Sequence, residues 1–145
     1  MNNKFEIGKD VAIKYIMFKK RTEKEVVNKL EVLNYSPNII DKIIAHLKET
    51  DYINDERYVN RYFQELKKIK NWSIKHVKQD LYNRGCECSI SDNELNEYEL
   101  QSIKNLYTKF NIKYPNASQE QKDEFIKALR NKGFMYDNIN SVIQF

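Results

Sequence analysis

Glycine, proline and cysteine are scarce in this chain: its 145 residues include three glycines, two prolines and two cysteines. So little glycine and proline leaves little material for β-turns or for a glycine-rich loop around a phosphate, and an all-helical fold is expected. Cys86 and Cys88 are separated by one residue, and such neighbours rarely form an unstrained disulfide, so we expect two free thiols. They also lack the second pair of ligands that a zinc site needs.

Long apolar runs and chemical motifs are also missing. The chain has neither a run of about 18 apolar residues nor the apolar core of a signal peptide, so we expect a cytoplasmic protein that does not cross a membrane. No nucleophile paired with a base, metal-ligand spacing or cofactor motif is visible. His46 and His76 lie in separate predicted helices and are interpreted as ordinary helix-surface residues. We therefore predict no catalytic residue, no metal and no cofactor, and look for function on a surface.

A short pattern occurs three times: an apolar residue, then Leu four positions later, then Asn or Gly four positions after that, then an aromatic residue or Cys. The three instances are Val26-Leu30-Asn34-Tyr35, Val77-Leu81-Gly85-Cys86 and Phe125-Leu129-Gly133-Phe134. Apolar residues four apart share one face of a helix, and Asn or Gly can adopt the left-handed conformation that ends a helix. The pattern therefore predicts three tandem three-helix repeats, stacked in one array, at residues 1–50, 51–95 and 96–145.

Polar residues mark the expected helix starts. Predicted caps are Thr22 and Ser118, each with a capping-box partner three residues later, and Ser36 before a proline, Asn54, Ser73, Ser91 and Asp137. The first helix is expected over residues 11–20, with Phe18 on its apolar side. Residues 54–70 are expected to bury an apolar face that includes Ile69. A short helix at Ser91 is expected to end before another helix begins near Asn96.

Positive charge is concentrated in the middle repeat, although the whole chain carries only +4. Residues 57–84 contain eight cations and two anions, a net charge of +6, and the remainder sums to −2. The eight cations are Arg57, Arg61, Lys67, Lys68, Lys70, Lys75, Lys78 and Arg84. A field of this kind attracts DNA phosphates or an acidic protein groove, and these eight residues are the candidate binding residues. The alternative is a lysine-rich face that only contacts solvent.

The helical wheel separates this charge from the core. With 100° per residue, Arg57, Arg61 and Lys68 lie opposite the apolar arc that contains Tyr58 and Leu66. Most of the ten tyrosines fall on core arcs, so stacking on nucleic-acid bases is not their general role. Trp72, just before Ser73, has two interpretations that stay open: a hydrophobic staple at a helix start, or a contact residue among the cations.

Taken together, these motifs resemble the RecX family of regulatory proteins, and the resemblance covers the chain from about residue 9 to its end. The matching residues are the run Asp51-Tyr52-Ile53-Asn54-Asp55-Glu56-Arg57-Tyr58 with Tyr62, the first-repeat set Ala12, Tyr15, Arg21, Glu25 and Leu30, and the middle-repeat set Ser73, Val77, Leu81 and Gly85. The resemblance implies an elongated, curved protein that lies in the helical groove of a RecA recombinase filament on DNA. There it would modulate, and usually inhibit, ATP hydrolysis, filament growth and strand exchange.

The partners implied in this way are the RecA filament and DNA, single-stranded or duplex, bound weakly and without sequence preference by a monomer. The rival interpretation is a stand-alone helical DNA-binding module. Helices starting at residues 22 and 37 could be drawn as a helix-turn-helix, but the second helix directs Asp41, Lys42, His46 and Lys48 outward. That set is poorly suited to reading base edges.

Overall fold

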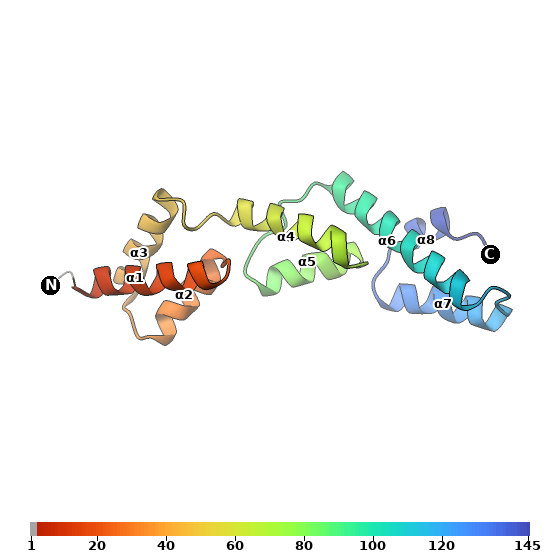
Figure 1. Ribbon diagram of the computed structural model, residues 1–145, viewed down its shortest axis with the longest axis horizontal. Coiled ribbons are helices and arrows are strands. Elements are labelled where there is room, and N and C mark those ends of the chain that lie inside the picture. Colours follow the sequence, from red (N-terminus) through yellow and green to blue (C-terminus); the bar gives the residue numbers. More distant parts are fainter. Residues whose placement is uncertain (1–2) are drawn as a thin grey trace. The chain divides into compact units, whose positions relative to one another are not determined.

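The computed structural model describes residues 3–145, and this part of the chain contains eight α-helices and no β-strand (Figure 1). The helices are α1 (Asn3–Phe18), α2 (Glu23–Val32), α3 (Pro37–Glu49), α4 (Asp55–Ile69), α5 (Ile74–Asn83), α6 (Asp92–Lys113), α7 (Gln119–Asn131) and α8 (Tyr136–Val142). The expected all-α fold class is confirmed. No helix in the described range is long and apolar enough to cross a membrane.

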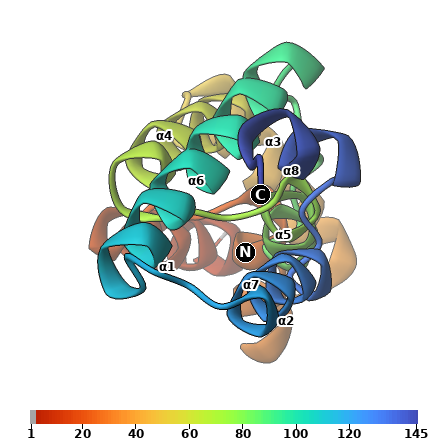
Figure 2. The same ribbon diagram turned by 90° about the vertical axis from the view of Figure 1, so that its right-hand side faces the viewer.

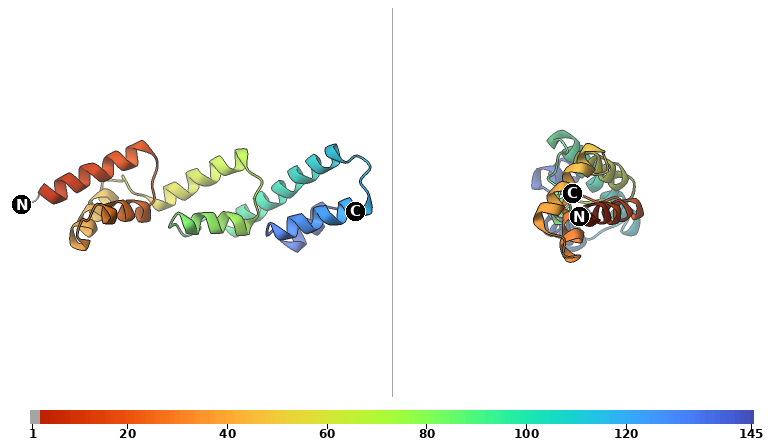
Figure 3. Two further views of the ribbon diagram at one scale, coloured as in Figure 1. Left: turned by 90° about the horizontal axis from the view of Figure 1, so that it is seen from below. Right: turned by 90° about the vertical axis from the view of Figure 1, so that its left-hand side faces the viewer.

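Packing divides the chain into two compact units. The first unit holds the chain up to Arg61 together with Leu81–Cys88, and the second holds Tyr62–Asp80 together with Ser89–Phe145. In the first unit, α1, α2 and α3 pack against one another (Figure 3). Their shared core consists of Ala12, Ile16, Val26, Leu30, Ile40, Ile43, Ile44, Leu47 and Ile53. Burial of these apolar side chains is the main force that holds the three helices together.

The second unit has an equivalent core at its C-terminal end. There α6, α7 and α8 close around one cluster (Figure 2). The buried members of this cluster are Ile103, Leu129, Phe134, Ile139 and Ile143. Phe110 of α6 adds a ring that stacks on Phe125 of α7, with ring centroids 4.4 Å apart.

The three repeated helix stops have the predicted geometry. Asn34, Gly85 and Gly133 adopt positive φ angles of 65°, 86° and 93°. The amide of the following residue donates in each case to the pattern leucine five positions earlier: Tyr35 to Leu30, Cys86 to Leu81 and Phe134 to Leu129, at 3.1, 2.9 and 3.2 Å. This is the hydrogen bond that closes a Schellman motif, so the recurring pattern encodes one backbone structure three times.

Most predicted helix starts are also confirmed. Thr22 and Ser118 form reciprocal capping boxes. The side chains of Ser36, Asn54, Ser73 and Ser91 each accept a hydrogen bond from the amide three residues later. The prediction for Asp137 is wrong, because α8 begins at Tyr136 and its cap residue Met135 makes no side-chain cap. The Met135 amide donates instead to the Glu99 carboxylate of α6, at 3.2 Å, so the start of α8 is bonded to another helix and not to a side chain of its own first turn.

Several further expectations differ from the structure, among them the first helix, which was expected over residues 11–20 and is α1, Asn3–Phe18. The short helix at Ser91 and the helix expected near Asn96 are one continuous helix, α6, because neither glycine nor proline interrupts residues 92–113. The expected boundary between residues 95 and 96 therefore falls inside α6. Phe18 and Ile69, expected in apolar faces, are 86% and 73% exposed. Each is the last residue of its helix, where no neighbouring helix covers the side chain.

Within the first unit, two hydrogen bonds join the start of α2 to α4 and to the connection after α5. The Thr22 hydroxyl, fully buried, donates to the carbonyl of Arg84 at 2.7 Å. The amide of Glu23 donates to the carboxylate of Asp55 at 2.9 Å. The start of α2 lies so close to Gly85 that a Cβ added to this glycine would be 2.5 Å from the Cβ of Lys24.

The same joint occurs within the second unit. The Ser73 hydroxyl donates to the carbonyl of Lys132 at 2.9 Å, and the amide of Ile74 donates to the carboxylate of Glu99 at 2.9 Å. Gly133 takes the place of Gly85, with the side chains of Ser73 and Lys75 beside it. The spacing of 51 residues between the two hydroxyls and 48 between the two carbonyls matches the intervals of the helix-stop pattern. The same pair of polar contacts therefore occurs once in each unit, at the start of α2 and just before α5, and this joint is a repeated structural element.

Candidate functional site

The eight cations predicted as binding residues have different environments. Arg57, Arg61, Lys67, Lys68, Lys70, Lys75 and Lys78 are exposed, whereas Arg84 is half-buried. Arg57 and Arg61 line one hollow in the first unit, and Lys67 and Lys70 line another in the second unit. Lys68, Lys75 and Lys78 line neither hollow, and the stem of Lys75 lies beside Gly133.

Arg84 has structural contacts inside the first unit. Its Nη1 donates to the hydroxyl of Tyr58 at 2.8 Å, and its carbonyl accepts the Thr22 hydroxyl described above. Burial raises the pKa of the Tyr58 hydroxyl, and the hydrogen bond from Arg84 opposes that rise. Arg84 thus connects the end of α5 to α4 and to the start of α2.

The first-unit hollow brings together four cations from two separate parts of the sequence. It has a volume of about 120 Å³ and is lined by Lys20, Arg21, Arg57 and Arg61 with Ile16, Tyr52, Asn54 and Tyr58. No carboxylate occurs among these lining residues. Lys20 and Arg21 come from the connection after α1, and the predicted binding residues, all within 57–84, did not include them. We call this site the cationic hollow.

Two of its guanidinium groups are held in place by neighbours. Arg21 lies over the ring of Tyr15, with Cζ 3.8 Å from the ring centroid, and its Nε donates to the Tyr15 carbonyl at 3.4 Å. Arg57 forms an ion pair with the Asp51 carboxylate and donates through Nη2 to the Asp51 carbonyl at 2.8 Å. The hydrogen bond from Arg57 lowers the pKa of Asp51. Side chains that are already ordered lose less conformational entropy when a ligand binds.

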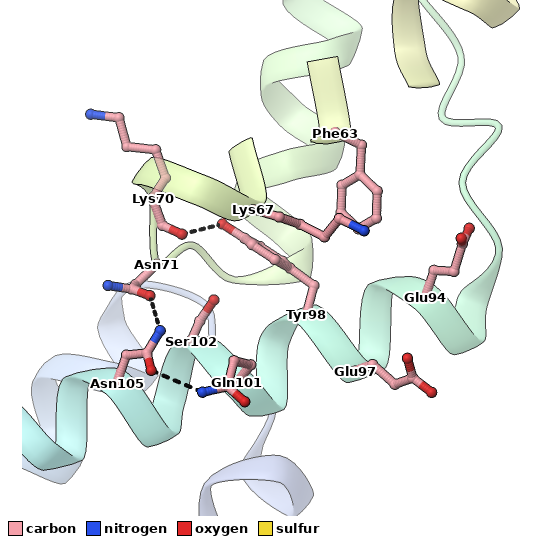
Figure 4. A pocket seen from close by; sticks show the side chains of 10 residues that line it. All are labelled: Phe63, Lys67, Lys70, Asn71, Glu94, Glu97, Tyr98, Gln101, Ser102 and Asn105. Atoms are coloured by element: carbon pink, nitrogen blue, oxygen red, sulfur yellow. Dashed lines mark hydrogen bonds between the residues drawn. The ribbon is translucent and has the colours of Figure 1, made fainter. Parts of the chain in front are cut away.

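The second-unit hollow has a different character. It has a volume of about 340 Å³ and lies between the end of α4 and the first half of α6 (Figure 4). Its lining residues are Phe63, Lys67, Lys70, Asn71, Glu94, Glu97, Tyr98, Gln101, Ser102 and Asn105. Two ammonium groups are balanced by two carboxylates, and the amides between them provide both donors and acceptors. We call this site the mixed-charge hollow.

Hydrogen bonds order the wall of the mixed-charge hollow. The Tyr98 hydroxyl donates to the Lys70 carbonyl at 2.9 Å and accepts from the Trp72 amide at 3.1 Å. Burial raises the pKa of this hydroxyl, which keeps it protonated and able to donate. Asn105 donates to the Asn71 side chain at 2.9 Å (Figure 4). These bonds tie the connection after α4 to α6.

Trp72 itself stacks on His76, with ring centroids 3.9 Å apart and an interplanar angle of 6°. His76 is one position before the residue that a hydrophobic staple uses.

Within residues 3–145, no group of three or more His, Cys, Asp or Glu side chains could hold a metal ion. Cys86 and Cys88 are free thiols, as expected, and burial raises the pKa of Cys86 to about 12.

Comparison with known proteins identifies the family. The family model for the RecX first three-helix domain matches residues 9–47, the segment that forms most of α1, α2 and α3. "Regulatory protein RecX" of Finegoldia magna is 32% identical over 142 residues, covering 93% of this chain and 69% of the relative. The chain belongs to the RecX family.

Other RecX proteins agree with this assignment. "Regulatory protein RecX" of Streptococcus agalactiae serotype V is 34% identical over 142 residues, which cover 94% of this chain and 54% of that relative. The chain thus spans about half the length of several curated relatives that it matches. The crystal structure of RecX from Lactobacillus salivarius matches with a TM-score of 0.87 and 27% identity, over 99% of this chain and 97% of that one. A second crystal structure of regulatory protein RecX, 18% identical with a TM-score of 0.76, supports the fold alone.

Within this RecX-family chain, sequence reasoning missed how the cations are grouped. It found Arg57 and Arg61 but not their neighbours Lys20 and Arg21, because the two pairs are far apart in the sequence. The available signal was the run Lys19-Lys20-Arg21 itself, which lies between α1 and the Thr22 cap. Glu94 and Glu97 were also missed, so the charge around Lys67 and Lys70 was overestimated.

Proposed function

We propose that this protein binds the RecA recombinase filament on DNA and modulates it, most often by lowering ATP hydrolysis, filament growth and strand exchange. The observation that carries the proposal is membership of the RecX family over nearly the whole chain, with 93% of it aligned to a relative named regulatory protein RecX. The protein acts as a monomer in this proposal and needs no cofactor. The three tandem repeats expected from the sequence serve as successive contact modules in this proposal, with α6 continuing across the expected boundary at residue 95.

The two hollows suit the two components of a filament on DNA. The cationic hollow carries positive charge without a lining carboxylate, so it favours phosphate. The mixed-charge hollow has balanced charges and many amides, which suits the polar rim of a protein partner better than a nucleic-acid backbone. We propose direct contact with RecA for the second hollow and with DNA for the first.

The eight cations of residues 57–84 contribute unequally in this proposal. Arg57, Arg61, Lys67 and Lys70 are the contact residues of the two hollows. Lys68, Lys75 and Lys78 add to the positive field that raises the association rate. Arg84 supports the fold through Tyr58 and contributes charge without direct contact.

A stand-alone, sequence-reading DNA-binding module is disfavoured by the contacts of α3. Lys48 forms an ion pair with Glu23, and His46 places its ring edge-on to Phe5, with centroids 6.1 Å apart. Only Asp41 and Lys42 of the four outward residues then remain as candidates to contact base edges. A recognition helix reads bases with several side chains, usually Arg, Asn or Gln.

The test separates these two functions. RecA-catalysed strand exchange is followed with and without the protein, and duplex binding is measured in parallel over a panel of sequences without RecA. The proposal predicts slower strand exchange, together with weak, salt-sensitive duplex binding that does not depend on sequence. Tight binding to one duplex sequence with no effect on strand exchange would refute it and would support the DNA-binding module.

A further inference from the structure

Charge and size both restrict what the cationic hollow can hold. Lys20, Arg21, Arg57 and Arg61 line it, and none of its lining residues carries a carboxylate. Arg57 is paired with the Asp51 carboxylate outside the lining, and the three other cations still give the site a positive charge that favours an anion. Its volume of about 120 Å³ is well below the roughly 300–1,000 Å³ of small-molecule sites. A group of a few heavy atoms with several oxygens, such as a phosphate, fits these limits. Guanidinium groups match the geometry of phosphate oxygens through paired N–H donors.

Two exposed aromatic residues belong to, or directly adjoin, the segments that form the hollow. Phe18, the last residue of α1, lies two residues before Lys20 in the sequence and is 86% exposed. Tyr52 lines the hollow itself and is 39% exposed. A phenylalanine this exposed gains nothing from the core of its own unit. Proteins bind unpaired nucleotides by combining cations that track the phosphates with exposed rings that stack on the bases, and here an exposed ring is two residues from a cation of the hollow.

We infer that the cationic hollow binds one phosphate group of a single-stranded nucleic acid and that Phe18 stacks on an unpaired base of the same strand. This deepens the proposed function, because it identifies the residues that contact DNA in the filament complex. An acidic protein segment would satisfy the four cations but would leave the exposed ring of Phe18 without a planar partner. A duplex would supply phosphate but keeps its bases stacked and inaccessible to the ring.

The test measures binding of a fluorescent thymidine oligonucleotide, about 20 nucleotides long, to the full chain without RecA over a range of salt concentrations. The double variant K20Q/R61Q should bind several-fold more weakly at low salt. The slope of log affinity against log salt should become shallower by about 0.7, the value for one phosphate of a single strand. The matched control K14Q/K42Q removes two exposed cations of the same unit that do not line the hollow. Thermal melting establishes that each variant is folded.

The aromatic contact is tested separately. Phe18→Ala should weaken oligonucleotide binding by roughly 5- to 150-fold, the range for loss of one stacked base, and should change binding to a duplex of the same length much less. Val32→Ala, 76% exposed on α2, is the control and should leave both affinities unchanged.

Three results would overturn the inference. The first is a K20Q/R61Q variant that binds DNA like the K14Q/K42Q control. The second is a K20Q/R61Q variant that keeps its DNA affinity but loses binding to the RecA filament, which would assign the hollow to protein carboxylates. The third is a Phe18→Ala variant that loses duplex and single-strand binding equally. Because the DNA assay contains no RecA, its failure leaves the proposed regulation of RecA to be judged by strand exchange alone.

Discussion

Replacing Glu99 with glutamine should destabilise the second unit, although the two side chains have nearly the same shape. Glu99 is fully buried in α6. One carboxylate oxygen accepts from the Ile74 amide at 2.9 Å, and the other accepts from the Met135 amide at 3.2 Å and from the Asn138 side chain at 2.5 Å. This single side chain thereby accepts hydrogen bonds from the first amide of α5 and from the amide of the N-cap residue of α8.

A glutamine at this position has only one acceptor oxygen. If this oxygen faces Met135 and Asn138, the NH₂ group of the glutamine faces the Ile74 amide. Two hydrogen-bond donors then face each other. A buried donor left without an acceptor costs about 1–3 kcal/mol, and the remaining bonds lose the contribution of the negative charge. The melting temperature should therefore fall by roughly 2–4 °C for each kcal/mol lost.

The assay compares Glu99→Gln with Glu97→Gln, an exposed position two residues earlier on the same helix, by thermal melting and amide hydrogen exchange. The control should melt like the parent. In Glu99→Gln the Ile74 amide should exchange its hydrogen faster than in the parent. The increase in exchange rate should be larger at Ile74 than at Met135. Equal melting temperatures for the two variants, with unchanged exchange at Ile74, would refute the role assigned to this carboxylate.

Three other outcomes follow from the joints and the buried groups. Gly85→Ala should lower the free energy of unfolding by about 2–5 kcal/mol and Gly133→Ala by about 1–2 kcal/mol, because both positions need a left-handed backbone but only a Cβ at residue 85 would lie 2.5 Å from a neighbouring atom. Urea denaturation measures both losses, and equal losses would contradict this. Iodoacetamide should label Cys88 well before Cys86, which is 6% exposed and has a pKa of about 12, and mass spectrometry of the labelled peptide would detect the reverse order. The free energy of unfolding should fall between about pH 9 and pH 12. The pKa values of Cys86 and Tyr98 are raised in the folded chain, so in this pH range the folded chain holds more protons than the unfolded chain. Urea denaturation at pH 8 and pH 11 measures the loss of stability.

Local signals predicted the helices well because those signals act within a few residues. The stops at Asn34, Gly85 and Gly133 and the caps at Thr22 and Ser118 all have the expected geometry. Such motifs depend on hydrogen bonds between residues that are at most five apart. The family resemblance depended on the same local sequence patterns and was confirmed by the comparisons.

Most of the failures concern tertiary structure, because local preference does not determine which distant residues come into contact and which side chains stay uncovered. Asp137 was predicted as a cap, but Glu99, in another helix, satisfies the amide at the start of α8. Phe18 was placed in the core on helical spacing alone, although no neighbouring helix covers the end of α1. Lys20 and Arg21 could not be grouped with the middle repeat, because only the folded first unit brings them beside Arg57.

The most direct test of the account is the rate of RecA-dependent ATP hydrolysis on single-stranded DNA, followed over time with the protein present at a small fraction of the RecA concentration. A modulator of the filament should change the rate at this ratio, and we expect a progressive decrease as filaments lose subunits. The variant K20Q/R61Q should need a higher concentration for the same decrease. An unchanged rate, even when the protein equals RecA in concentration, would contradict the proposed function.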